Sequence, residues 1–155
     1  MVTSDGSQAN YTGNALEQYV EHHLVQAGYV RVKPQQFKPG IYLGQPIYAR
    51  RFHCGTSIYE TPIFCDFAIF HPSKWPDCLI IEAKWQQVGG SVDEKYPYLV
   101  LNIQYRYCYP SILLLDGGGY KKGAEKWVRS QAGNGNLLHV FNMAQFQTWA
   151  NKGNL

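Results

Sequence analysis

Two apolar stretches that contain charged side chains constrain the fold of this chain more than any other feature. The stretch from Pro62 to Phe70 (PIFCDFAIF) holds a single aspartate, Asp66. The stretch from Cys78 to Trp85 (CLIIEAKW) holds Glu82 and Lys84. An unpaired charge in an apolar interior costs several kcal/mol. These three charges must therefore compensate one another or bind something that does.

The same two stretches predict a β-hairpin, because each is a short apolar run and the intervening HPSKWP contains turn-forming residues. If the turn is centred near Ser73 and Lys74, residues whose numbers sum to about 148 lie opposite one another, which sets Asp66 across from Glu82. Residues two apart on a strand project to the same face, so Lys84 accompanies Glu82. The sequence thus predicts that three charges converge on one patch of a sheet.

Two neighbouring carboxylates repel each other unless a cation lies between them. Oxygen ligands suit Mg²⁺, or Mn²⁺ in its place, better than zinc, and the carbonyl of Ala83 can add a ligand to Asp66 and Glu82. Such a cation can hold a phosphate and activate a water molecule, and Lys84 would orient that water or neutralise the transition state. The alternative is a buried ion pair of Lys84 with either carboxylate that only specifies the fold. We favour the catalytic interpretation because perturbed buried groups cluster at functional sites.

The rest of the chain predicts alternating helices and strands. After a polar, flexible tail over residues 1–11, the expected elements are a helix over Thr12–Gly28, a strand over Ile47–Phe52, the hairpin, a helix from the Ser91 to Glu94 capping box to about Tyr107, a strand over Ser111–Leu115, a helix over Gly123–Arg129, a strand over Leu137–Phe141 and a helix over Asn142–Ala150. This order predicts an α/β fold with a central mixed β-sheet flanked by helices, in a single domain over residues 12–155.

Composition supports a folded domain outside the membrane. The chain has 155 residues, of which 45% are hydrophobic and 16% charged, and no apolar run approaches the ~18 residues that a membrane span needs. The first residues are polar and do not resemble a secretory signal, so a cytoplasmic protein is expected. The four cysteines form no CxxC pair, which argues against a structural zinc site.

The combination of motif and element order resembles the PD-(D/E)XK nuclease superfamily, which includes type II restriction enzymes, Holliday-junction resolvases and some phage or intron homing endonucleases. The matching residues are Asp66 and the tripeptide Glu82-Ala83-Lys84. The stretches Asp93–Ile103 and Leu113–Trp127 also look like segments of restriction-type nucleases. One departure is Cys65, where the pattern has proline. The literal Pro76-Asp77 lies in the expected turn and is not assigned to the motif.

The resemblance implies a restriction-endonuclease-like core and a Mg²⁺-dependent endonuclease that cleaves double-stranded DNA, site-specifically as in restriction or homing. One alternative is a structure-selective nuclease, such as a junction resolvase or a repair nicking enzyme. Another is a catalytically inactive DNA-binding module, against which the intact Asp66, Glu82 and Lys84 argue. One active site cuts one strand, so a homodimer or a higher homo-oligomer is the natural route to a double-strand break.

Two further residues are candidates for the active site. Members of the superfamily often supply another carboxylate from the first helix, and Glu17 fits that place, although an ordinary solvent-facing helix glutamate is an equal alternative. Gln86 continues the face of Glu82 and Lys84 and can bind a water molecule or the phosphate.

The predicted DNA-binding residues come from two segments. The net charge of +3 is small, but cations gather in an acid-free stretch and beside the Gly-rich turn DGGGYKKG. Scattered, solvated cations are the alternative for any one of them. The candidates are Arg31, Lys33, Lys38, Arg50, Arg51, Tyr120, Lys121 and Lys122.

Overall fold

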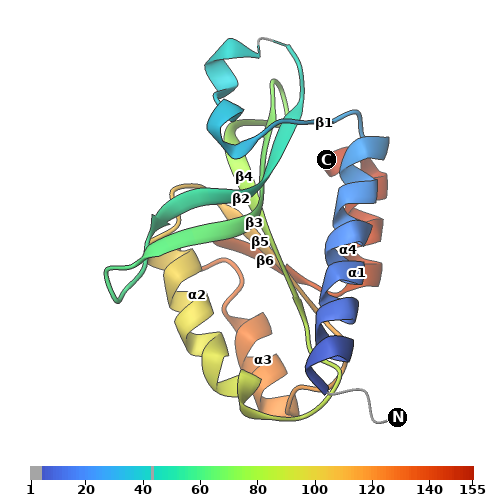
Figure 1. The fold of residues 1–155 in the computed structure, drawn as a ribbon, viewed down its shortest axis with the longest axis vertical. Helices are drawn as coiled ribbons and strands as arrows, with labels where there is room; N and C mark the ends of the chain where they lie inside the picture. The colour runs from blue at the N-terminus through green and yellow to red at the C-terminus, as the bar shows by residue number, and fades with distance from the viewer. Residues whose placement is uncertain (1–4, 43) are drawn as a thin grey trace.

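The computed structural model describes residues 5–42 and 44–155, and it has helices on both faces of one mixed sheet (Figure 1). In chain order the helices and strands are α1 (Asp5–Gln26), β1 (Val30–Arg31), β2 (Ile47–Thr56), β3 (Pro62–His71), β4 (Trp75–Trp85), α2 (Tyr96–Tyr105), β5 (Ser111–Asp116), α3 (Lys122–Ser130), β6 (Leu137–Phe141) and α4 (Met143–Trp149). Short 3-10 turns precede β2 and α2. In this part of the chain no helix is long and apolar enough to cross a membrane.

The six strands lie in sequence order across the sheet. Strands β2, β3 and β4 are antiparallel neighbours, whereas β5 and β6 continue the sheet in parallel with β4. Parallel neighbours need a crossover connection; α2 lies between β4 and β5 in the chain, and α3 between β5 and β6. The predicted α/β fold with a central mixed sheet is confirmed.

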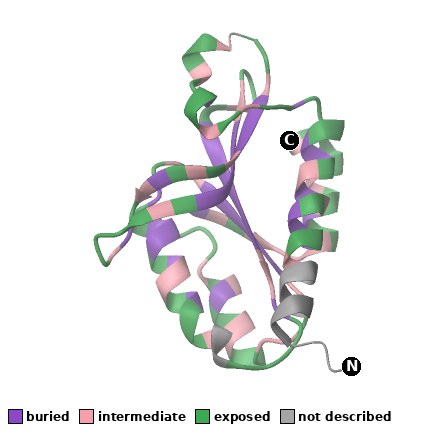
Figure 2. Ribbon diagram, in the orientation of Figure 1, coloured by how far each residue is buried: buried purple, intermediate pink, exposed green. Residues whose placement is uncertain are grey.

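Each face of the sheet has its own apolar core, and the buried residues concentrate in the strands (Figure 2). Helices α2 and α3 cover one face, where Val100, Ile103 and Val128 are buried. Helices α1 and α4 cover the other face through Leu24, Phe146 and their neighbours. Since β4 and β5 are covered on both sides, nearly every residue in their centres is buried, which explains their continuous apolar sequences.

The predicted hairpin register is present in the β3–β4 ladder. Phe67 pairs with Ile81 and Ile69 pairs with Leu79, which is the spacing that sets Asp66 opposite Glu82. The regular β3–β4 pairs end at Phe67, whereas β3 continues to pair with β2 as far as Pro62. Figure 1 shows that the β2–β3 hairpin bends away to one side, whereas β4 continues beside β5. Asp66 and Glu82 therefore lie at the fork where the two strands part.

The structure differs from the sequence-based expectation mainly at element ends. Helix α1 begins at Asp5, not at Thr12 as expected. The sequence does not reveal this earlier start, because the first turns lack the apolar periodicity that marks the rest of the helix. Residues 1–4 of the expected tail lie outside the described residues. Strand β1 was not expected, since it pairs only through Val30 and Arg31 with β2. The helix expected from Ser91 starts at Tyr96, with Pro97 in its first turn and a 3-10 turn before it.

Candidate active site

Asp66 lies at the centre of a hydrogen-bonded cluster on the α2–α3 face of the sheet. Its carboxylate accepts the backbone N–H of Ala83 at 2.9 Å through Oδ2 and a guanidinium N–H of Arg51 at 2.8 Å through Oδ1. The Ala83 bond replaces a ladder bond where β3 and β4 separate. Asp66 is only 3% exposed. The donors on its two oxygens therefore hold a buried carboxylate in place.

Glu82 is held from the opposite side. It is 2% exposed, and its Oε1 accepts the hydroxyl of Tyr107 at 2.8 Å. Tyr107 follows α2 and is itself buried in the core on this face of the sheet. The Tyr107 hydroxyl on one oxygen and the Lys84 ammonium on the other give this buried carboxylate a defined orientation.

Lys84 joins the two carboxylates. Its Nζ lies 3.1 Å from Oε2 of Glu82 and 3.4 Å from Oδ2 of Asp66. The Lys84 side chain is 39% exposed, whereas both carboxylates are buried. The predicted convergence of Asp66, Glu82 and Lys84 on one patch is what the structure shows.

The environment drives the two carboxylates apart in pKa. Burial alone would raise the pKa of Asp66, but the Lys84 ammonium, hydrogen bonding that includes the Ala83 N–H, and the Arg51 guanidinium outweigh it and lower the pKa. Burial raises the pKa of Glu82 to about 7, with the charge of Asp66 adding to the effect and Lys84 opposing it. Although burial disfavours its charge, the pKa of Lys84 is raised by Glu82 and Asp66. Pairs of acids separated in this way are typical of active sites.

Glu17 approaches the same cluster from α1 through two arginines. Its carboxylate pairs with Arg50 and lies 3.1 Å from a guanidinium nitrogen of Arg51, which also binds Asp66. Glu17 is buried, so it is not the solvent-facing residue of the alternative interpretation. Arg51 connects Glu17 to Asp66. The catalytic role of Glu17 stays a prediction.

The donor set fits a hard divalent cation. Asp66 and Glu82 supply carboxylate oxygens at one site, and Mg²⁺ commonly binds through one or two carboxylates with waters and phosphate completing its shell. Among the residues described, no group of three or more His, Cys, Asp or Glu gathers into a metal cluster. Glu17 instead pairs with Arg50 and Arg51. The charge of Asp66 helps to raise the pKa of Glu82, and a divalent cation bound between the two acids would offset that repulsion.

Comparison with models of known protein families shows which family the chain belongs to. A model of the PD-(D/E)XK nuclease superfamily domain matches residues 8–154. The chain belongs to this superfamily. No curated protein and no solved structure matches it. The resemblance carried by Asp66 and the Glu82-Ala83-Lys84 tripeptide is thus confirmed at the level of the family.

Two residues of the PD-(D/E)XK motif region make contacts other than those expected. Ala83 contributes its N–H to Asp66, and the predicted use of its carbonyl as a metal ligand stays a prediction. Gln86 is buried, accepts the hydroxyl of Tyr96, and donates its amide N–H to the carbonyls of Val88 and Gly119 at 3.4 Å. These bonds fix the loop after β4, and the expected binding of water or phosphate by Gln86 stays a prediction.

Sequence reasoning missed Tyr107 and the pairing of Arg51 with Asp66. Tyr107 was expected only as the end of a helix, and nothing local distinguishes it from the other eleven of the twelve tyrosines. Arg51 was predicted to bind DNA, but the register places it opposite Asp66, between the pairs Arg50 with Phe67 and Phe52 with Cys65. Reading that register from the sequence requires the β2–β3 alignment, but the strand expected over Ile47–Phe52 stops short of Thr56, where the hairpin with β3 closes.

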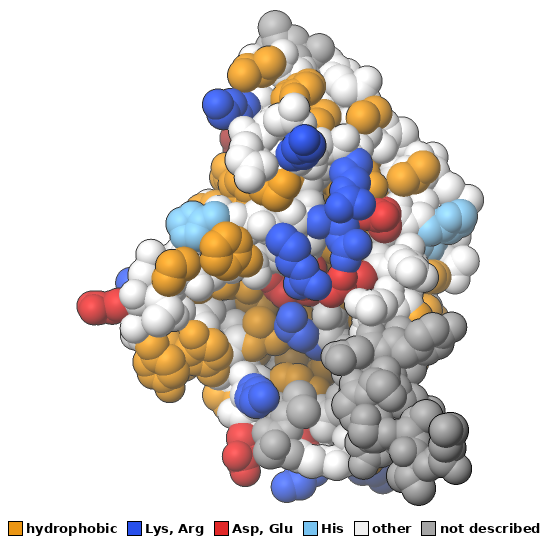
Figure 3. All heavy atoms as spheres, in the orientation of Figure 1, with side chains coloured by type: hydrophobic (Ala, Val, Ile, Leu, Met, Phe, Trp, Pro, Cys, Tyr) orange, Lys and Arg blue, Asp and Glu red, His pale blue; other side chains and the backbone are white. Residues whose placement is uncertain are grey.

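The predicted DNA-binding residues are divided between the two sides of the cluster. Lys and Arg side chains run in a column down one face, beside and above acidic side chains (Figure 3). Arg31, Lys33 and Arg50 line a hollow of about 380 Å³ with Val32, Pro34 and Gln36. Lys38 is exposed nearby, and Lys121 and Lys122 are exposed at the start of α3, next to half-buried Tyr120.

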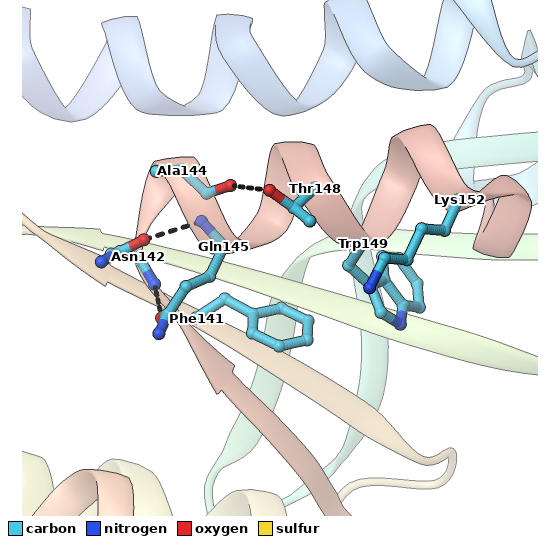
Figure 4. A pocket seen from close by; sticks show the side chains of 7 residues that line it. All are labelled: Phe141, Asn142, Ala144, Gln145, Thr148, Trp149 and Lys152. Atoms are coloured by element: carbon cyan, nitrogen blue, oxygen red, sulfur yellow. Dashed lines mark hydrogen bonds between the residues drawn. The ribbon is translucent and has the colours of Figure 1, made fainter.

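A second hollow, of about 400 Å³, lies between β6 and α4 (Figure 4). Its lining includes Phe141, Trp149 and Lys152 but none of the charged cluster. Asn142 and Gln145 hydrogen-bond each other's backbone N–H there, at 2.8 and 2.9 Å, and so cap α4. The residues that line this hollow include no Asp, Glu or His, so the candidate active site is the cluster at the fork.

Proposed function

We propose that this protein is a Mg²⁺-dependent endonuclease that hydrolyses phosphodiester bonds of double-stranded DNA, with Mn²⁺ able to replace Mg²⁺. One observation carries the proposal: Lys84 forms ion pairs with both Asp66 and Glu82, which come from two strands at a fork in an otherwise apolar sheet. Superfamily membership supports a nuclease, and the chemistry of the donors supports the cation.

The residues divide the work of hydrolysis. Asp66, Glu82 and the carbonyl of Ala83 would hold the cation, which lowers the pKa of bound water and offsets negative charge at the phosphate. The Lys84 side chain is partly exposed, and its ammonium would orient the attacking water and stabilise the charge that develops on the phosphoryl oxygens. Tyr107 keeps Glu82 oriented through the 2.8 Å bond.

The column of cations supports a polyanionic substrate. Arg31 and Lys33 are exposed beside the hollow that Arg50 also lines, and Lys121 and Lys122 present a second group of positive charges. Contacts of this kind bind phosphates without reading sequence, and they position a duplex. Site-specific cleavage, as in restriction or homing, would require further side chains that contact base edges.

Cleavage of supercoiled plasmid DNA with MgCl₂ tests the proposal. The variants Asp66→Asn and Lys84→Ala should each lose at least about 100-fold in rate, the scale of a positioned acid–base group. Asp77→Asn is the matched control, since Asp77 is an exposed aspartate on the same strand β4. EDTA should stop cleavage by the parent protein. Cutting that persists in EDTA, or in both active-site variants when thermal unfolding shows them folded, would refute the mechanism.

The same assay separates site-specific from structure-selective cleavage. Discrete fragments from a linear duplex are expected for a restriction or homing enzyme. Cleavage of a four-way junction or a nicked duplex, with linear duplex left intact, would instead assign the resolvase or repair alternative. Tight, metal-independent binding of duplex with no cleavage of any substrate would assign the inactive DNA-binding module.

A further inference from the structure

Both oxygens of the Asp66 carboxylate already have partners from the protein. Oδ1 accepts from Arg51 at 2.8 Å. Oδ2 accepts from the Ala83 N–H at 2.9 Å, with the Lys84 ammonium at 3.4 Å. A divalent cation that approaches this carboxylate must therefore compete with a positive charge that the chain itself supplies.

Arg51 is the partner that can leave most readily. Its side chain is 60% exposed, against 39% for Lys84, and the Ala83 donor is part of the backbone of β4. Arg51 also has a second acceptor, because a guanidinium nitrogen lies 3.1 Å and 3.3 Å from the two oxygens of Glu17. Moving off Asp66 would leave the guanidinium still paired with a carboxylate.

The backbone at Arg51 is unusual for its residue type. Its φ is +53° within strand β2, a left-handed conformation that non-glycine residues adopt rarely and that tends to occur at functional sites. The flanking pairs of the β2–β3 ladder keep their register on both sides of it. The local distortion thus directs one long cationic side chain toward Asp66 without disturbing the sheet.

We propose that Arg51 is a built-in counter-cation, which occupies Asp66 in the metal-free protein and is displaced to Glu17 when a divalent cation binds. The inference rests on the proposed function, because it requires Asp66 to be a metal ligand. Arg51 is then a positioning residue that acts through Asp66. A mere structural link between α1 and the sheet would not change how tightly Asp66 binds metal.

Calorimetric titration of the DNA-free protein with MnCl₂ tests this exchange. Arg51→Gln should bind Mn²⁺ at least about threefold more tightly than the parent, because apparent affinity falls with the fraction of molecules in which the site is free. Arg51→Lys, which keeps the charge but not the forked guanidinium, should lie between the two. Arg106→Gln, a change of an exposed arginine after α2, should match the parent. Asp66→Asn should abolish binding.

Nuclear magnetic resonance gives a readout that is independent of affinity. The arginine Nε resonance that is absent from Arg51→Gln should shift when MgCl₂ is added to the parent and should stay in place in Asp66→Asn. Equal Mn²⁺ affinity of parent and Arg51→Gln, with binding still lost in Asp66→Asn, would overturn the inference and leave the proposed function standing. Absence of binding in parent and Arg51→Gln alike would overturn both.

Discussion

Two buried acids of the same site have opposite electrostatic surroundings. Asp66 is surrounded by donors and cations, which lower its pKa despite burial. Glu82 has one neutral donor and a shared lysine, and burial raises its pKa to about 7. Glu82 therefore depends more than Asp66 on each remaining partner, since the charged form of an incompletely compensated buried acid is costly.

Removing the Tyr107 hydroxyl should show how much the stability of the protein depends on the hydrogen bond to Glu82. Tyr107→Phe keeps the ring in the core but leaves Glu82 Oε1 without its 2.8 Å donor. We expect the free energy of unfolding to fall by about 1.5–3 kcal/mol, the usual contribution of a hydrogen bond to a charged group. Urea denaturation measures this loss. Tyr105→Phe, at an exposed position in α2, is the control and should change stability by less than about 0.5 kcal/mol; equal losses in the two variants would contradict the role of the Tyr107 hydroxyl.

At the scale of elements, the end of β4 is fixed by the loop that follows β5. The Gly119 N–H donates to the carbonyl of Gln86 at 2.7 Å, and a Cβ on Gly119 would lie 2.3 Å from the backbone carbon of Gln87. A side chain cannot be placed there unless the backbone moves. Gly119 thus allows the loop after β5 to lie close to the loop after β4. The contact is at Gln86, two residues beyond Lys84.

We predict that Gly119→Ala destabilises the protein by more than about 1 kcal/mol and slows plasmid cleavage, because the end of β4 must shift to accept the methyl group. Gly123→Ala is the matched control. Gly123 lies in α3 with open space where its Cβ would be, so alanine should leave stability unchanged or raise it by up to about 1 kcal/mol. Thermal unfolding and cleavage rates check both variants. A Gly119→Ala protein as stable and active as Gly123→Ala would show that the close approach is unimportant.

The elements that the sequence predicted best are those whose signal is local. The β3–β4 register followed from the turn and from the charges in PIFCDFAIF and CLIIEAKW, and β6 has the predicted bounds, Leu137–Phe141. Tertiary contacts set the rest. β1 forms only by pairing with β2, and Tyr107 reaches Glu82 only because α2 packs across the sheet. Patterns along the chain carry no information on such contacts.

For the whole molecule, the distribution of cations matters more than the net charge of +3. The column of Lys and Arg in Figure 3 faces the same side as the fork. If this face binds DNA, each cation lost should reduce the number of counterions released when DNA binds, and with it the dependence of affinity on salt.

Fluorescence anisotropy with a duplex in EDTA should therefore show a shallower salt slope for Lys33→Gln than for the parent. The expected change in the slope of log K against log salt is about 1 for one phosphate contact. Lys152→Gln, on the hollow between β6 and α4 (Figure 4), is the control and should keep the parental slope. A larger effect from Lys152 than from Lys33 would place the DNA on the other side of the molecule.

If the cluster of Asp66, Glu82 and Lys84 is the proposed active site, each chain cuts one strand. The strands of a duplex run in opposite directions, so a two-fold symmetric pair of chains is expected for a double-strand break. Mixing the parent with excess Lys84→Ala should then form mixed pairs with one working site. The linear plasmid product should fall more steeply than the nicked product as Lys84→Ala is added, whereas adding Asp77→Asn should reduce neither. Analytical ultracentrifugation with a cognate duplex would show two chains per DNA. Linear and nicked products that decline in parallel, together with one chain per DNA, would instead indicate two independent nicking events by single chains.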